Sequence, residues 1–301
     1  MKAIAILVIG YNRADFLYQR LLELHNIGLN HVHVSIDCNS YGQVNPEIDR
    51  IRKKKFPNFH WIYAEKPLGI GKHVPQAVTS ILKDYEGVVV IEDDCKVSPV
   101  ALTTAISQLR EGLEEDVLTI GFHSSLAIPR FLTGFEINNY WRKSHFFSPW
   151  GWGTTRDAWK SYSQELHEEF IESELKNSTY WNLKPKISQD RWLRRFKLVS
   201  RFPNITWDYQ MNYAGFRSNK FHLIPMYRCV ENVGFDNDRA TNTKGKRPSW
   251  YLGREIANSK FSQPGKIKIF FARLISIVDR FTWAGDLNIK KDLRHRLKRN
   301  E

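Results

Sequence analysis

Short apolar runs alternate with amphipathic helical patterns along the first half of the chain. Four runs predict strands, and they lie at 3–9, 31–36, 59–64 and 87–91. The first and last are almost unbroken by polar residues, which is typical of strands covered on both faces. Between the runs, the pattern predicts helices from Asn12 as N-cap to near Gly28, over 72–83, and from Ser98 to about Arg110.

This alternation predicts an α/β fold, a mostly parallel Rossmann-like sheet with helices on both faces. Ligands of such sheets bind at the carboxyl ends of the strands. Those ends carry Tyr11-Asn12-Arg13, Asp37 and Glu92-Asp93-Asp94. These three places are therefore the candidate sites of chemistry.

The second half of the chain is less regular and rich in aromatic residues. Runs at 118–122 and 221–226 predict further strands, and the remainder is typical of loops and short helices that form a wall over the sheet edge. The segment Trp150-Gly151-Trp152 could present indole rings to a sugar, although core packing is the commoner use of such residues. We expect 1–125 and 126–260 to be two halves of one domain and 261–301 to be an extension.

The chain carries an excess of positive charge. Its 301 residues hold 45 Lys and Arg against 32 Asp and Glu, a formal net charge of +13, which favours a partner rich in phosphate. The excess is concentrated at 266–301, which hold ten basic and four acidic residues, with apolar residues at helical spacing. This amphipathic basic extension suits an anionic membrane surface, and packing on the domain with a solvated tail is the alternative.

Cysteine content and hydropathy bear on the compartment. Cys38, Cys95 and Cys229 are too few and too scattered for a disulfide framework, which favours a reducing compartment. No apolar stretch reaches the roughly 18 residues that a transmembrane helix needs. We expect a cytoplasmic chain, peripheral on the inner face of the plasma membrane if 266–301 bind it.

Three successive carboxylates, Glu92-Asp93-Asp94, follow the apolar run at 87–91. Carboxylates this close repel one another unless a cation lies among them, and hard divalent ions prefer oxygen ligands. A solvated turn that also caps the next helix is the alternative. The position after a buried strand favours the metal site, with Mn²⁺ or Mg²⁺ as its ion.

Other candidate residues allow two interpretations each. Asp37 could accept a hydrogen bond from a base or ribose, or be a turn carboxylate. Arg13 and the pair Lys72-His73, at a helix start flanked by glycines, could bind phosphate or stack on a base. Asp208, set among aromatic residues, could act as a general base or be a carboxylate at a helix N-terminus.

Several ordered segments between about residues 3 and 235 resemble the N-acetylglucosaminyltransferase I family and related bacterial nucleotide-sugar glycosyltransferases of the GT-A fold. The matching segments are 5–9 with 12–13, 34–38, 70–73, 88–99, 146–159 and 207–211. The match departs at Tyr209, where the family segment has a second carboxylate beside the one at Asp208.

The resemblance implies a role for each matched residue. Nucleotide contacts fall on Arg13, Asp37, Lys72, His73, Glu92 and Asp93. Asp94 would be the metal ligand of a DXD-like motif, and Asp208 the catalytic base. The sugar and acceptor site would be shaped by Trp150, Gly151 and Trp152.

The implied enzyme is a metal-dependent inverting glycosyltransferase, hexosyl or N-acetylhexosaminyl in type. It would move a sugar, N-acetylglucosamine by the named family, from a UDP-sugar to a hydroxyl of a glycan or lipid-linked acceptor in polysaccharide biosynthesis. A nucleotidyltransferase is an alternative, but Tyr11-Asn12-Arg13 is no glycine-rich phosphate loop. A non-enzymatic nucleic-acid-binding protein would explain the charge but not the carboxylates, so no nucleic-acid partner is expected.

Overall fold

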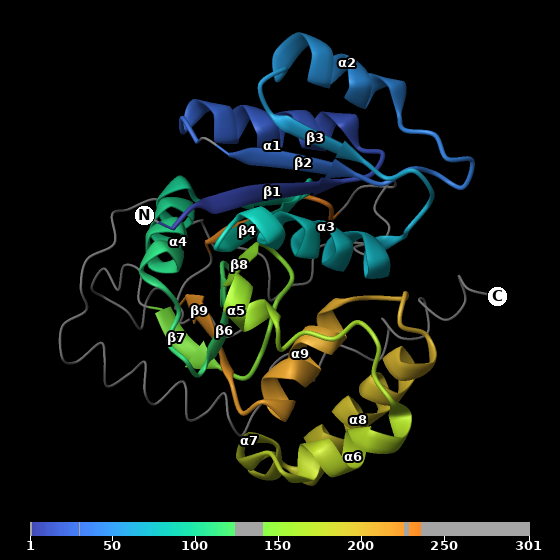
Figure 1. Cartoon of the computed structure of the whole chain (residues 1–301), viewed down its shortest axis with the longest axis vertical. Helices are drawn as coiled ribbons and strands as arrows, with labels where there is room; N and C mark the ends of the chain where they lie inside the picture. The colour runs from blue at the N-terminus through green and yellow to red at the C-terminus, as the bar shows by residue number, and fades with distance from the viewer. Residues whose placement is uncertain (1, 30, 124–140, 226–228, 236–301) are drawn as a thin grey trace.

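A computed structural model describes residues 2–29, 31–123, 141–225 and 229–235 of the chain (Figure 1). The strands are β1 (Ile4–Gly10), β2 (Val32–Ile36), β3 (His60–Tyr63), β4 (Gly87–Glu92), β5 (Cys95–Val97), β6 (Val117–Gly121), β7 (Trp141–Ser144), β8 (Trp152–Thr155), β9 (Phe221–Pro225) and β10 (Val230–Asn232). The helices are α1 (Ala14–Asn26), α2 (Pro46–Lys55), α3 (Ile70–Asp84), α4 (Pro99–Glu111), α5 (Arg156–Trp159), α6 (Glu168–Lys176), α7 (Thr179–Asn182), α8 (Lys186–Arg201) and α9 (Asp208–Arg217).

The large sheet is mostly parallel, as the sequence predicts. Its strand order is β3-β2-β1-β4-β8-β6-β9-β7. β1 pairs in parallel with β2 and β4, β2 with β3, and β6 with β9. β8 is antiparallel to β4 and to β6, and β7 is antiparallel to β9. Strands from both sides of residue 125 therefore share one sheet.

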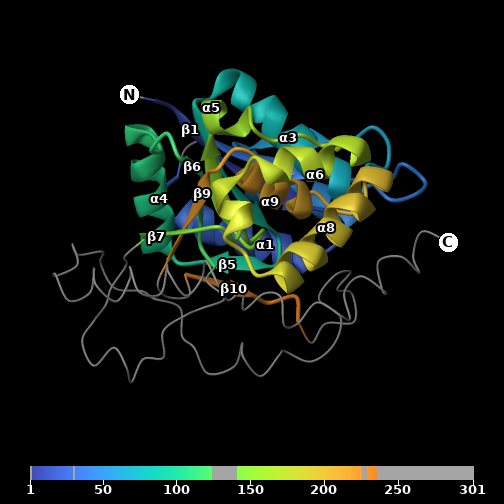
Figure 2. The ribbon, with the colours of Figure 1, turned by 90° about the horizontal axis from the view of Figure 1, so that it is seen from below.

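Helices cover both faces of this sheet, which confirms the predicted layers (Figure 2). Ile6 and Val8 of β1 belong to the apolar cluster that includes α1, α2 and α4. Leu7 and Ile9 belong to the cluster on the other face, with α3, α5 and α9. Because every side chain of β1 is buried, the strand reads as an unbroken apolar run.

A third apolar cluster joins α6, α7, α8 and α9, which lie together in Figure 1. α9 takes part in two clusters. Its Met211 and Ala214 pack toward the sheet, and its Tyr213 and Phe216 pack toward the other three helices. α9 therefore connects the helical group to the sheet, and Asp208 is its first residue.

Three elements differ from the prediction. Arg13, not Asn12, is the N-cap of α1, because the Leu17 N–H donates to the Arg13 carbonyl oxygen at 3.0 Å and the first turn starts one residue later. α2 was not predicted, since Ile48 and Ile51 are its buried residues and give a weak apolar period. The predicted wall of loops and short helices is also wrong, because β7 and β8 lie in the sheet and α8 has 16 residues.

The small sheet fixes the turn after β4. β5 pairs antiparallel with β10, joining Cys95 to Asn232. The Val233 N–H donates to the Asp94 carbonyl oxygen at 2.8 Å, and the Asp93 N–H donates to the Ile9 carbonyl oxygen at 3.0 Å. The backbone of the acidic turn is therefore held from both sides.

The extension at 261–301, with its amphipathic stretch 266–301, lies outside the described residues. Among the helices that are described, none is both long and apolar enough to cross a membrane. The three cysteines are buried and free, in line with the expectation of no disulfide framework.

His222 on β9 predicts a pH dependence of stability. It is 0% exposed, its Nδ1 lies 2.8 Å from the Thr119 hydroxyl, and burial lowers its pKa to about 3. The unfolded chain, with a histidine pKa near 6.5, binds the proton first, so this contribution to stability is intact above pH 6.5 and is lost as the pH falls toward 3. Between pH 7 and pH 5 the free energy of unfolding should fall by about 2 kcal/mol through this group.

Urea unfolding at the two pH values tests this. The difference between pH 7 and pH 5 should be smaller by that amount in His222→Gln than in the wild type. Equal differences in the two proteins would contradict the assignment.

Candidate active site

The acidic turn is carried by the central strand β4, at the carboxyl edge of the parallel strands. Asp93 and Asp94 are 3% and 5% exposed, and Glu92 is partly buried. Because the valines of β4 are buried in the sheet, the three carboxylates come together at the carboxyl end of this strand. Their mutual repulsion must be balanced by a positive charge.

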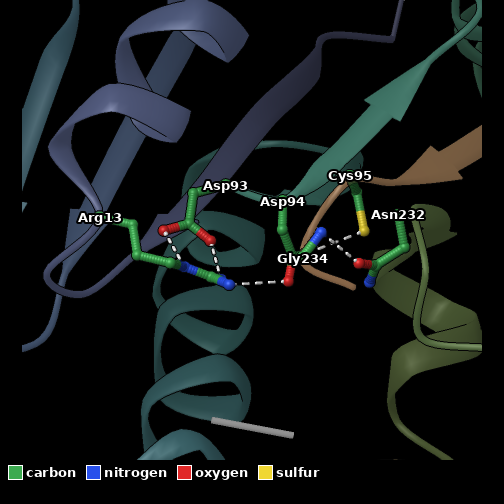
Figure 3. A network of polar contacts seen from close by, with 6 residues as sticks. All are labelled: Arg13, Asp93, Asp94, Cys95, Asn232 and Gly234. Atoms are coloured by element: carbon green, nitrogen blue, oxygen red, sulfur yellow. Dashed lines mark hydrogen bonds and ion pairs between the residues drawn. The ribbon is translucent and has the colours of Figure 1, made fainter. Parts of the chain in front are cut away.

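Arg13 supplies a positive charge to this turn from the start of α1 (Figure 3). Its Nε donates to Asp93 Oδ2 at 3.2 Å, and its Nη2 contacts Asp93 Oδ1 closely. Its Nη1 donates to Asp94 Oδ2 at 3.0 Å. Burial lowers the pKa of Arg13, but the attraction of Asp93 and Asp94 outweighs it and holds that pKa above its ordinary value.

One guanidinium does not balance the whole cluster. Burial, with repulsion from Asp94 and Asp93, raises the pKa of Glu92 well above its ordinary value. Burial also raises the pKa of Asp93 to about 7, against the opposing attraction of Arg13. The turn is therefore short of positive charge, which a divalent cation would supply.

The side chains at this turn fit a divalent cation. Glu92, Asp94 and Cys95 each offer one ligand atom, and these atoms lie within 4.8 Å of one another. The carboxylate oxygens suit Mn²⁺ or Mg²⁺. Burial and the neighbouring carboxylates, Asp94 first, raise the pKa of the Cys95 thiol well above its ordinary value, so the thiol stays protonated.

Asp208 approaches the acidic turn from the second half of the chain. Its charge contributes to the raised pKa of Glu92, and after burial it is the next cause of the raised pKa of Tyr162. The Thr206 hydroxyl makes a close contact with Asp208 Oδ1. Trp207, stacked on Trp152 at 5.0 Å between ring centroids, fixes the start of α9.

A close backbone approach sets this segment against α3. A methyl group on Gly71 would lie 2.2 Å from the carbonyl oxygen of Asn204, so only glycine fits there. The first turn of α3, which carries Lys72 and His73, thus lies directly against the loop that leads to Asp208. Lys72 is exposed and His73 is 3% exposed.

Asp37 and His73 make internal hydrogen bonds. The carboxylate of Asp37 accepts the N–H groups of Leu68 at 3.0 Å, Gly69 at 2.8 Å and Cys38 at 2.9 Å. His73 Nε2 lies 2.8 Å from the Ser35 hydroxyl, and burial lowers the pKa of His73. Both residues therefore hold the loop before α3 against β2, whether or not they also touch a ligand.

The aromatic segment is divided between core and surface. Trp152 is 0% exposed and packs beside Phe147 in the core. This is the core packing that the sequence offered as the alternative to a sugar contact. Gly151 has φ +70°, and a methyl group there would lie 2.8 Å from the Phe122 ring. Trp150 is partly exposed and packs edge to face on His123 at 4.6 Å. Of the three, Trp150 has the side chain that can reach a ligand.

A cavity of about 570 Å³ opens at the carboxyl ends of β1 and β2. It is lined by Tyr11, Asn12, Asn39, Gln43, Val44, Asn45 and Pro46. Apart from Tyr11-Asn12, the sequence did not single out these residues. The amide-rich run from Asn39 to Asn45 after the second strand is the signal that could have revealed them.

No protein-family model and no curated protein matches this sequence. Among solved structures, the chain is similar to a mannosyltransferase from Pyrobaculum calidifontis in complex with GDP-Man and Mn²⁺, with 14% identity over 53% of this chain and 46% of that chain and a TM-score of 0.37. It is similar to a mannose-1-phosphate geranyltransferase from Thermus thermophilus, with 11% identity over 74% and 73% of the two chains and a TM-score of 0.36.

A third similar structure is glucosyl-3-phosphoglycerate synthase from Mycobacterium tuberculosis, in complex with Mn²⁺, UDP and phosphoglyceric acid. The identity is 12% over 54% of this chain and 58% of that chain, with a TM-score of 0.37. The match thus spans less than two thirds of the synthase and of the mannosyltransferase.

Asp37→Asn tests the internal role of Asp37. The new amide would turn an N–H donor toward the N–H groups of Leu68 or Gly69, and the free energy of unfolding should fall by about 1–3 kcal/mol. Asp157→Asn is the control, because the Asp157 side chain is 86% exposed and should change stability by about 0.5 kcal/mol or less. Equal small losses in urea unfolding would show that Asp37 does not hold this loop.

Proposed function

We propose that this chain is a metal-dependent inverting glycosyltransferase of the GT-A fold that uses a nucleotide-sugar donor. The observation that carries the proposal is the acidic turn at the end of β4, with Asp208 of α9 close enough for its charge to contribute to the raised pKa of Glu92. A cation site beside a separate carboxylate can serve both the departing diphosphate and the attacking hydroxyl.

The cavity beside β1 is the proposed place for the nucleoside. Tyr11 offers an aromatic face, and the amide side chains of Asn39, Gln43 and Asn45 can donate and accept hydrogen bonds. The described residues that line this cavity carry no acidic or basic side chain, which suits a neutral base. Asp37 and His73 would support this pocket through the loop and strand that they hold.

The phosphates would lie between the cavity and the acidic turn. Arg13 follows Tyr11 and Asn12 directly and reaches Asp94, and Lys72 is exposed at the first turn of α3. Both can pair with phosphate oxygens. Glu92 and Asp94 would hold Mn²⁺ or Mg²⁺, whose chemistry there is to neutralise the negative charge of the departing diphosphate.

Asp208 is the proposed general base. The Thr206 hydroxyl contacts one of its carboxylate oxygens, and Asp208 is the first residue of α9. Asp208 would take the proton from the acceptor hydroxyl as that oxygen attacks the anomeric carbon opposite the diphosphate. A single in-line displacement of this kind inverts the anomeric configuration.

The finer assignments belong to the same proposal. Uridine is implied by the resemblance around Asp37 and His73, and N-acetylglucosamine is taken from the named family. The acceptor would be a glycan or lipid-linked sugar near Trp150, at the inner face of the plasma membrane. Residues 266–301 would bring the enzyme to that surface.

Asp208→Asn should abolish transfer without loss of nucleotide binding. Removing a general base typically lowers the rate by about 10²–10⁴. Turnover of a UDP-sugar would be measured beside the melting-temperature shift caused by UDP with Mn²⁺. Asp190→Asn, on α8, is the control and should keep full turnover. Near-normal turnover in Asp208→Asn would remove Asp208 from this role.

Tyr11→Ala should weaken nucleotide binding, because stacking of a base on an aromatic ring contributes about 1–3 kcal/mol. The matched control is Tyr41→Ala, since Tyr41 is 84% exposed in the loop between β2 and α2 and is not among the residues that line the cavity. Melting temperatures with UDP, GDP and the matching nucleotide sugars, with and without Mn²⁺, measure the effect. If the nucleotides raise the melting temperatures of Tyr11→Ala and Tyr41→Ala equally, the base does not stack on Tyr11.

A further inference from the structure

We infer that Arg13 competes with a divalent cation for Asp94, and that a nucleotide diphosphate relieves this competition. Arg13 then couples nucleotide binding to metal binding. The nucleotide part of this inference rests on the proposed function. The competition itself rests on contacts within the acidic turn and is testable with the metal alone.

The two oxygens of Asp94 are both engaged. Oδ2 accepts from Arg13 Nη1 at 3.0 Å, and Oδ1 lies 3.4 Å from the Cys95 sulfur. The Cys95 thiol is a weak donor, whereas the guanidinium makes a charge-assisted hydrogen bond. A cation that takes Asp94 as a ligand therefore meets the positive charge of Arg13 as its main competitor.

Arg13 is held unequally by its two partners. Nε and Nη2 both bind Asp93, while Nη1 alone reaches Asp94 (Figure 3). Bidentate pairs of arginine and carboxylate are stronger than single contacts. The contact to Asp94 can thus be broken while Asp93 keeps the guanidinium in place.

Arg13 directly follows two residues of the 570 Å³ cavity along the chain. Tyr11 and Asn12 line that cavity, and Arg13 follows them at the start of α1. The phosphates of a nucleotide bound there would offer Nη1 a new anionic partner. Asp94 would then be released for the metal. Coupling of this kind is reciprocal, so the metal strengthens nucleotide binding by the same factor.

Two variants test this competition, and the second of them separates it from the net charge of the cluster. Asp93→Asn removes the bidentate partner and leaves Arg13 with Asp94 as its remaining carboxylate partner. The double variant Arg13→Gln/Asp93→Asn removes one positive and one negative group, so its cluster keeps the formal charge of the wild type. It removes both members of the Arg13–Asp93 pair together, and Asp94 keeps its contact with the Cys95 thiol.

The probe is Mn²⁺ alone, whose dissociation constant is read from the electron paramagnetic resonance signal of the free ion. Competition predicts that affinity decreases from the double variant to the wild type to Asp93→Asn. The gain in the double variant should be about tenfold, within the roughly 5–150-fold range of coupled sites. Net charge alone predicts that the double variant and the wild type bind equally.

A control pair and a second measurement complete the test. Arg52→Gln/Asp49→Asn removes an Arg–Asp pair on α2 and should leave Mn²⁺ affinity unchanged. The second measurement adds UDP to the wild type, corrected for Mn²⁺ bound by free UDP, and should tighten Mn²⁺ binding by several-fold more than in the double variant. The wild-type half of this measurement shows by itself whether the two ligands are coupled, and it does not depend on the folding of a variant.

The outcomes distinguish this inference from the proposed function. Equal Mn²⁺ affinity in the double variant and the wild type would overturn the competition. Tighter Mn²⁺ binding in the double variant with no effect of UDP in either protein would keep the competition and remove the nucleotide coupling. Absence of UDP binding to the wild type by melting temperature, with or without Mn²⁺, would remove the proposed donor class.

Discussion

The ion pair between Arg13 and the acidic turn is the constraint on which the rest of the site depends. Two buried aspartates and a partly buried glutamate leave one strand end together, and Arg13 is the guanidinium that contacts both aspartates. The pKa of Glu92 and that of Asp93 are both raised, so one guanidinium leaves the turn short of positive charge. The site is thereby prepared for a further cation.

The fold brings Asp208 near enough to this turn for its charge to contribute to the raised pKa of Glu92. Parallel pairing of β1 with β4 brings Arg13 and Asp93 to the same sheet edge, although they are 80 residues apart. The contact of Val233 with Asp94 holds the turn from the other side. α9, packed both on the sheet and on the group of α6 to α8, carries Asp208 toward the turn. Each part of the proposed chemistry therefore depends on packing far from it.

Sequence periodicity was sufficient for the elements whose side chains are all buried. β1 and β4 bury both faces, so their runs of Ile and Val are unmistakable, and the strand ends locate Arg13 and Glu92 directly. α2 was not predicted because only two of its ten residues are buried, which gives a weak hydrophobic periodicity, although Asn45-Pro46 marks its start. Tyr11 and Asn39 line one cavity only through the pairing of β1 with β2, which no local pattern reports. The depth of Trp152 likewise follows from β8 lying between β4 and β6.

The central claim is that the turn at Asp94 and the cavity at Tyr11 form one site for a divalent cation and a nucleotide. Crystals grown with Mn²⁺ and UDP test it most directly, because anomalous scattering at the manganese edge locates the ion. We expect the ion in contact with the Asp94 carboxylate, Arg13 turned from Asp94 to a phosphate, and the uracil beside Tyr11. Manganese and UDP bound away from Asp94, with Arg13 still on both aspartates, would contradict the account.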